Sequence, residues 1–249
     1  NAGYPPEVHF HRPDNRHGEA FYSLDRDNSM QLIATKVPFE RERGGKAIYS
    51  DIDYMLLGLI IERITGQQQD QYLEQTLYRP MGLSHTLFNP LRKGITPQQI
   101  AATELAGNSR GGRVTFPADQ GGVVRGNVHD EKAHYAFDGV AGHAGLFSTA
   151  RETASLAMLA LHGGYGLTPV FSPAVVQQFV RPSASDHTVG LGWRTATGGD
   201  LNWHFGPYAS AYAFGHTGWT GTATLIDPYY GLVVVLLTNK KHSPILSEG

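Results

Sequence analysis

The stretch AIYSDIDYMLLGLIIERITG, residues 47–66, constrains the fold of this chain more than any other. Ser50 and Asp53 have the form of a capping box, and Gly66 supplies a left-handed stop. Between them, apolar residues recur at the three- and four-residue spacing of one helix face: Ile52, Met55, Leu56, Leu59, Ile60 and Ile64. The pattern predicts a helix that begins after Ser50 and ends at Gly66, with Tyr49 just outside its N-terminus.

Helical patterns occupy the middle of the chain, and strand patterns follow them. We expect further helices over residues 68–78, 97–105, 149–163 and 172–179, with long loops otherwise filling residues 84–145. Four short runs then have strand character: TVGLGWRTA, AYAFGHTG, GTATLIDP and GLVVVLLTN. The turn DPYYG joins the last two runs into an antiparallel hairpin, which we expect to be buried on both faces. This order predicts an α+β fold with helices covering the sheet.

The composition excludes several classes of protein. A chain of 249 residues that is 41% hydrophobic can bury a sizeable core, and its formal charge of -2 without a basic block argues against a nucleic-acid partner. The absence of cysteine excludes a disulfide, a thiolate metal site and a cysteine nucleophile. The longest apolar runs, MLLGLII and GLVVVLL, are far shorter than the roughly 20 residues of a spanning helix. We therefore expect no membrane contact from this chain itself.

Tyr49 is the first candidate for chemistry. The unpaired N–H groups at the start of a helix carry partial positive charge, which favours an anion and lowers the pKa of a phenol from about 10. A phenolate at this place could take a proton from a serine. The alternative is structural, because an aromatic residue before an N-cap often packs on the first turn as a hydrophobic staple.

The second candidate is FGHTGWTGT, residues 214–222, in which the glycines let another backbone approach a strand closely. His216 and Thr217 would present hydrogen-bond donors there to a carboxylate or an oxyanion. The alternative is a strand with a glycine bulge and a solvent-facing histidine. The glycine-rich stretch DGVAGHAGLFSTA lacks the spacing of a phosphate-binding loop and is expected to form a tight cleft wall.

The twelve histidines do not predict a metal site. His9, His11, His129 and His134 lie in expected loops, without the i, i+4 spacing and the glutamate of a zinc hydrolase motif. We expect neither a metal nor a cofactor.

Read together, these motifs carry a resemblance that none of them carries alone. NAGYPP, YSD before a helix, RPMGLSHT, GVAGHAGLFSTA, GHTGWTG and the final hairpin resemble, in this order, the class C β-lactamase and penicillin-binding serine hydrolase family. The resemblance implies a β-lactamase or DD-peptidase-like fold over residues 1–249 as a single domain. A helical lobe with cleft loops would span about 51–185 and the sheet portion about 186–249, with the nucleophile helix and a C-terminal helix lying outside the chain.

The resemblance also implies roles for individual residues. Tyr49 would transfer protons, His216, Thr217 and Gly218 would form the strand motif that binds the substrate carboxylate, and the N–H of Trp219 would contribute to the oxyanion hole. Asp51 stands where the family often has asparagine; a carboxylate cannot donate to a substrate, so Asp51 would hold a lysine or the helix start. The nucleophile of the family's Ser-x-x-Lys motif is not in this chain.

The implied activity is that of a serine-type D-alanyl-D-alanine carboxypeptidase in cell-wall metabolism. Its substrate would be a peptidoglycan stem peptide or a β-lactam, attacked through an acyl-serine intermediate without a cofactor. This places the protein in the periplasm or cell envelope, with an N-terminal segment outside the chain as one way to anchor it. Two alternatives stay open: an esterase or β-lactamase on the same site, and a non-catalytic module that binds cell-wall peptide or a partner.

Overall fold

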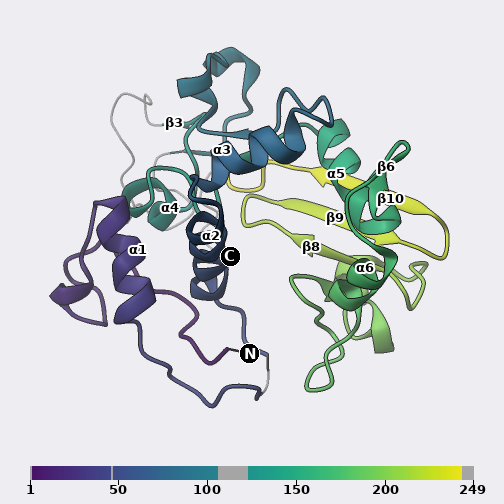
Figure 1. Cartoon of the computed structure of the whole chain (residues 1–249), viewed down its shortest axis with the longest axis horizontal. Coiled ribbons are helices and arrows are strands. Elements are labelled where there is room, and N and C mark those ends of the chain that lie inside the picture. The colour runs from purple at the N-terminus through teal and green to yellow at the C-terminus, as the bar shows by residue number, and fades with distance from the viewer. Residues whose placement is uncertain (1, 46, 106–122, 243–249) are drawn as a thin grey trace. The chain divides into compact units, whose positions relative to one another are not determined.

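The computed structural model describes residues 2–45, 47–105 and 123–242 and confirms the α+β class (Figure 1). Two compact units make up the chain, residues 1–147 with 239–249 and residues 148–238. The lobe boundaries expected from the sequence stay a prediction. None of the described helices combines the length and apolar character needed to cross a membrane.

The first unit contains mainly helices joined by long loops. Its helices are α1 (Arg26–Thr35), α2 (Asp51–Thr65), α3 (Gln69–Leu73), continued by a π-helical turn (Glu74–Tyr78), and α4 (Glu131–Ala136). Its 3-10 turns are Glu19–Phe21, Pro90–Lys93 and Pro97–Gln99. Its two small antiparallel sheets pair β1 (Leu87–Phe88) with β4 (Leu146–Phe147) and β2 (Glu104–Leu105) with β3 (Val123–Val124).

Helix α2 has the predicted ends. The Ser50 hydroxyl accepts a hydrogen bond from the Asp53 N–H at 3.4 Å, and Gly66 has a φ of 67°. Helix α1 runs beside α2 (Figure 1), and the start of α2 packs into a core built from both helices and the N-terminal segment. That core includes Val8, Phe10, Leu32, Ile33, Ile52, Met55 and Phe137.

The predicted apolar stripe of α2 is wrong in its second half. Ile60 and Ile64 are 48% and 79% exposed, whereas Ile52, Met55 and Leu59 are buried together with Gly58. The buried face is turned toward Gly58, where the loop at Gly142 approaches the helix.

Two expectations for residues 84–145 need correction. The helix expected over 97–105 is a three-residue 3-10 turn followed by β2, because the Thr103 N–H donates to the Val124 carbonyl at 2.7 Å and joins a strand pairing. Helix α4 was not expected at all. It is short, and its signal is local: the Asp130 side chain accepts from the Ala133 N–H at 2.9 Å and caps it. Residues 106–122 lie outside the described part.

The second unit is a four-stranded antiparallel sheet with helices packed on it. Its strands follow the order β10 (Leu232–Leu237), β9 (Thr222–Asp227), β8 (Phe214–Thr217) and β7 (Arg194–Thr195), beside a small hairpin of β5 (Gly164–Tyr165) and β6 (Thr168–Pro169). Its helices are α5 (Ala150–His162), α6 (Pro173–Val180), the short α7 (Asn202–Phe205) and a 3-10 turn, Thr197–Gly199. The predicted helices over 149–163 and 172–179 are confirmed, with Thr149 and Ser172 as N-caps.

The β9–β10 hairpin is confirmed, but its expected burial on both faces is wrong. Helix α5 packs on β9 and β10, and Val233 contacts the core formed by Ala157, Phe214 and Ile226. Successive side chains of a strand point to opposite faces. Leu232, Val234 and Leu236 therefore lie on the other face and are exposed.

Gly142 brings the loop before β4 into backbone contact with α2. A Cβ atom at Gly142 would lie 2.0 Å from the Tyr54 carbonyl oxygen and 3.1 Å from the Gly58 nitrogen. This is the tight packing expected of the glycine-rich stretch. Its role as a cleft wall stays a prediction.

We predict that Gly142→Ala lowers the free energy of unfolding by about 1–3 kcal/mol, because the added methyl group forces the loop and α2 apart. Chemical denaturation of the full-length protein measures the change. Gly45→Ala is the matched control, since its Cβ would only reach 3.4 Å from the Glu42 carbonyl oxygen. Equal effects of the two substitutions would contradict this account of the packing.

Candidate functional site

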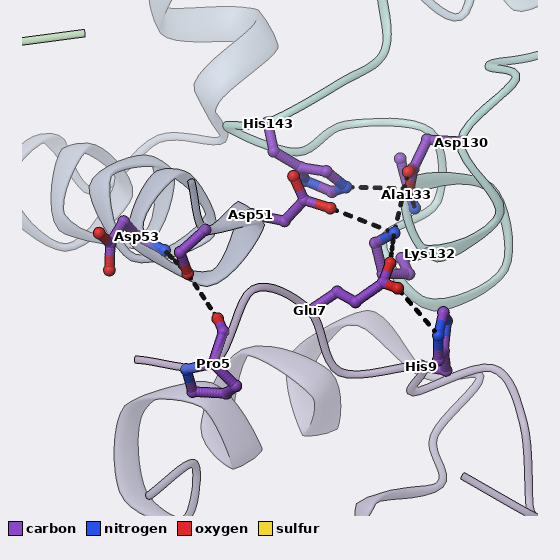
Figure 2. A network of polar contacts seen from close by, with 10 residues as sticks. Pro5, Glu7, His9, Asp51, Asp53, Asp130, Lys132, Ala133 and His143 are labelled. Atoms are coloured by element: carbon purple, nitrogen blue, oxygen red, sulfur yellow. Dashed lines mark hydrogen bonds and ion pairs between the residues drawn. The ribbon is translucent and has the colours of Figure 1, made fainter. Parts of the chain in front are cut away.

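A buried lysine lies at the centre of a polar cluster in the first unit. The side chain of Lys132, on α4, is 2% exposed. Its ammonium lies 3.1 Å from Asp130 Oδ2, 3.2 Å from Asp51 Oδ2 and 3.3 Å from Glu7 Oε2 (Figure 2). One cation is thus shared by three carboxylates from three distant parts of the sequence.

Local hydrogen bonds at the start of α2 place Asp51 in this cluster. The Ser50 hydroxyl donates to the Pro5 carbonyl at 2.7 Å (Figure 2). The Asp51 N–H donates to the Pro6 carbonyl at 2.8 Å. These bonds fix the helix N-terminus against the segment that carries Glu7. The N-cap residue required by the helix therefore also orients the site.

The cap of α4 brings in the other side of the cluster. Asp130 Oδ1 accepts from the Ala133 N–H and lies 2.9 Å from His143 Nε2, while its second oxygen contacts Lys132. The His143 side chain is buried, and the glycine-rich loop beside α2 carries it. Glu7 has a second partner too, because His9 Nε2 lies 3.2 Å from its Oε1.

The charges in this cluster stabilise one another. Burial by itself would lower the pKa of Lys132, but Asp130, Asp51 and Glu7 outweigh it and raise that pKa. The hydrogen bond from His9, with the charge of Lys132, lowers the pKa of Glu7 to about 2. Burial would raise the pKa of Asp130, but His143 and Lys132 hold it below its usual range. The lysine and both of these carboxylates are therefore ionised at pH 7.

Three side chains of the cluster have the spacing of a metal site. Asp51, Asp130 and His143 offer atoms that all lie within 4.8 Å of one another. The Lys132 ammonium contacts both of these carboxylates, so it already supplies the positive charge that they require. The absence of a metal stays a prediction. The contacts of the Lys132 ammonium with Asp51 and Asp130 support it.

Tyr49 lies immediately before the N-cap of α2, as predicted, and is about half-exposed. The expected lowering of its phenol pKa is wrong. Burial, followed by the charges of Asp51, Tyr54 and Asp130, raises the pKa of Tyr49 to about 12, and Lys132 opposes this only in part. Burial and the carboxylates beside the helix start thus act against the field of the helix, which favours the phenolate. Tyr49 is therefore a neutral phenol at pH 7 that can donate a proton.

His216 and Thr217 end strand β8 in the second unit. The glycine at position 215 does permit a close backbone approach, but the approaching backbone is the neighbouring strand. A Cβ at Gly215 would lie 2.0 Å from the Thr224 carbonyl oxygen of β9. Gly218 and Gly221 then form the tight turn into β9, with the Gly218 N–H donating to the Thr222 carbonyl at 2.7 Å. Trp219 is exposed in this turn.

The imidazole of His216 is neutral at pH 7. Burial and the nearby charge of Arg194 lower its pKa below the ordinary 6.5, although the Thr217 carbonyl opposes this. His216 Nδ1 lies 2.7 Å from the Thr217 carbonyl oxygen. A carbonyl only accepts hydrogen bonds, so Nδ1 carries the proton of the neutral ring and Nε2 is an acceptor. Such a ring does not offer a cation to a substrate carboxylate.

The structure brings together only part of the predicted site. Asp51 does hold a lysine and the helix start, but the lysine is Lys132 of the VHDEKA stretch. Tyr49 and Asp51 lie in the first unit, whereas His216, Thr217, Gly218 and Trp219 lie in the second, so their assembly into one site stays a prediction. Sequence reasoning missed Glu7, Asp130, Lys132 and His143. The only local signal was the capping pattern at Asp130.

Comparisons with known proteins agree with the motifs. The model of the family described as Beta-lactamase matches residues 2–247. The chain is 48% identical over 246 residues to an N-acetylmuramyl-L-alanine amidase of Bacillus subtilis (strain 168), covering 98% of this chain and 55% of that protein. It is 47% identical over 246 residues to a protein of Escherichia coli (strain K12) named as a predicted D-alanyl-D-alanine carboxypeptidase, covering 98% and 56%. The chain thus spans about half the length of these curated relatives.

The fold agrees as well. A penicillin-binding protein homolog from Caulobacter crescentus superposes with a TM-score of 0.57 at 20% identity, over 88% of this chain and 59% of that one. This likeness confirms the expected β-lactamase-like fold. With a family match over nearly its whole length, the chain belongs to the β-lactamase family of serine hydrolases.

Proposed function

We propose that the protein carrying this chain hydrolyses amide bonds of peptidoglycan peptides through an acyl-serine intermediate, as a D-alanyl-D-alanine carboxypeptidase of the cell envelope. The observation that carries the proposal is the start of α2, where Tyr49 directly precedes the N-cap and the charges of the Asp51–Lys132 pair both act on its phenol. The names of the relatives support peptidoglycan peptides or β-lactams as the substrates. No serine of the 249 residues precedes a lysine by three positions, so the nucleophile is assigned to another part of the protein.

In this proposal Tyr49 relays a proton as a neutral phenol. Its oxygen can accept the proton of the attacking serine while its own hydrogen passes to the leaving amine. General acid–base transfer of this kind contributes about 10²–10⁴-fold to a rate. An amide needs this step more than an ester does, because its leaving amine must be protonated.

A second candidate is the amide bond between muramic acid and L-alanine. The relative from Bacillus subtilis is named for it, and the state of His216 favours it. A D-alanyl-D-alanine peptide ends in a carboxylate next to the scissile bond, which a neutral acceptor binds poorly. In a muramyl peptide, the L-alanine continues into the next amide, whose N–H can donate to His216 Nε2.

Labelling with a fluorescent penicillin tests the acyl-serine mechanism. We predict a covalent label on a serine of the full-length protein, and a labelling rate about 10²–10⁴-fold lower in Tyr49→Phe. Tyr54→Phe, in the first turn of α2, is the matched control and should label at the wild-type rate. If Tyr49→Phe labels at the wild-type rate, its role in proton transfer is wrong. An intact protein that takes no label, and turns over no p-nitrophenyl ester or nitrocefin, favours the non-catalytic binding module.

The ratio of kcat/KM for a D-alanyl-D-alanine peptide to that for a muramyl-L-alanine peptide separates the two candidates. Because burial lowers the pKa of His216 below the ordinary 6.5, its cation is a minor form at pH 7.5 and becomes more populated as the pH falls. We predict that this ratio of kcat/KM values rises as the pH falls from 7.5 to 5. Effects of pH on acylation steps that both substrates share cancel in the ratio.

His216→Lys places a permanent cation at the strand end. A charged hydrogen bond to a carboxylate contributes roughly 1.5–3 kcal/mol, so this variant should raise the ratio at pH 7.5 by at least about tenfold and remove its pH dependence. His187→Lys, at a histidine exposed beside Asp200, is the control. A ratio that is flat with pH in the wild type, and unchanged in His216→Lys, would remove His216 from carboxylate recognition.

A further inference from the structure

The three carboxylates around Lys132 do not depend on it equally. Asp130 also pairs with His143 at 2.9 Å and accepts the Ala133 N–H, and Glu7 also pairs with His9 at 3.2 Å. Within the described part of the chain, the carboxylate of Asp51 has one ion-pair partner, which is Lys132 at 3.2 Å. Loss of the ammonium would therefore leave Asp51 uncompensated first.

That loss would act directly on the segment that carries Tyr49. The Asp51 side chain is only 15% exposed, so its charge cannot be solvated where it lies. Its movement toward water would pull on the first turn of α2, which the Ser50 hydroxyl and the Asp51 N–H tie to Pro5 and Pro6. Tyr49 immediately precedes this turn and would shift with it.

We propose that Lys132 is a positioning residue, which neutralises Asp51 and thereby holds Tyr49 in the place from which it transfers protons. The inference rests on the proposed acyl-serine function. The two charges depend on each other, because the lysine is needed only when residue 51 is an aspartate. Removing both charges should then do less harm than removing the lysine alone.

The test uses Lys132→Met, Asp51→Asn and the double variant in the full-length protein. The measured quantities are the acylation rate constant and the apparent affinity for a fluorescent penicillin, together with the Tm. A misplacement of about 1 Å costs roughly 100-fold in rate, so we expect Lys132→Met to slow acylation about 100-fold with little change in apparent affinity. Asp51→Asn should change the rate only a few-fold, since Lys132 keeps two carboxylates.

The double variant is decisive. Because Asn has the shape of Asp without its charge, we expect the double variant to acylate within about tenfold of the wild type, faster than Lys132→Met alone. Independent sites would instead give additive losses. A double variant as slow as Lys132→Met, or slower, would overturn the proposal, as would variants that change the Tm but leave the acylation rate of the folded protein unchanged.

A second double-mutant cycle, at Lys93 in the same unit, is the matched control. It lies 3.3 Å from Asp70 Oδ2 and 3.0 Å from Glu74 Oε2, so it too is a lysine held by more than one carboxylate. Lys93→Met, Asp70→Asn and their double variant should leave acylation unchanged. Effects on acylation equal to those of the Lys132 cycle would show a general loss of stability and overturn the specific role.

The outcomes distinguish this inference from the proposed substrate. A wild type that takes the penicillin label but hydrolyses neither peptide rejects the substrate assignment, while the Lys132 cycle still decides the inference. A wild type that takes no label, and turns over no p-nitrophenyl ester or nitrocefin, removes the chemistry that Lys132 is proposed to serve, and overturns both.

Discussion

The first unit depends on one buried ammonium group. Lys132 on α4 meets Glu7 from the N-terminal segment, Asp51 from the start of α2 and Asp130 from the cap of α4. A carboxylate buried without a counter-charge costs several kcal/mol, so the mostly buried Asp51 and Asp130 can meet only beside a cation, and the partly exposed Glu7 joins them there. The apolar core built from Phe10, Ile52 and their neighbours then packs beside them.

The sequence predicts what is decided locally. The ends of α2 follow from Ser50 and Gly66, and α5 from Thr149 and its apolar face, because caps and periodicity act within a few residues. The cluster around Lys132 is not local. Glu7 and Lys132 are 125 positions apart, and no spacing rule links a carboxylate in a loop to a lysine on a six-residue helix. Asp51 was expected to hold a lysine, but only the fold shows which one.

Local reasoning also failed where charges from elsewhere decide the protonation state. The field at the start of α2 favours a phenolate, yet burial acts on Tyr49 with the opposite sign, and the charges of Asp51 and Asp130 add to it. At His216 the strand position was read correctly, and burial with the charge of Arg194 lowers further a pKa whose ordinary value of 6.5 already leaves the imidazole mostly neutral at pH 7. A motif fixes which atoms are available, and the surrounding fold fixes their charge.

Strand β10 has a consequence for handling the isolated chain. Among the residues that the structure describes, it is the last strand in the order of its sheet, and its six residues, LVVVLL, carry no charge, proline or glycine. The outer backbone groups of such an edge are a template for another strand, and charged or bulged edges are the usual protection against self-association. In the described part of the chain this edge is apolar and favours aggregation, and Val234→Lys, on the exposed face, is the natural way to block it.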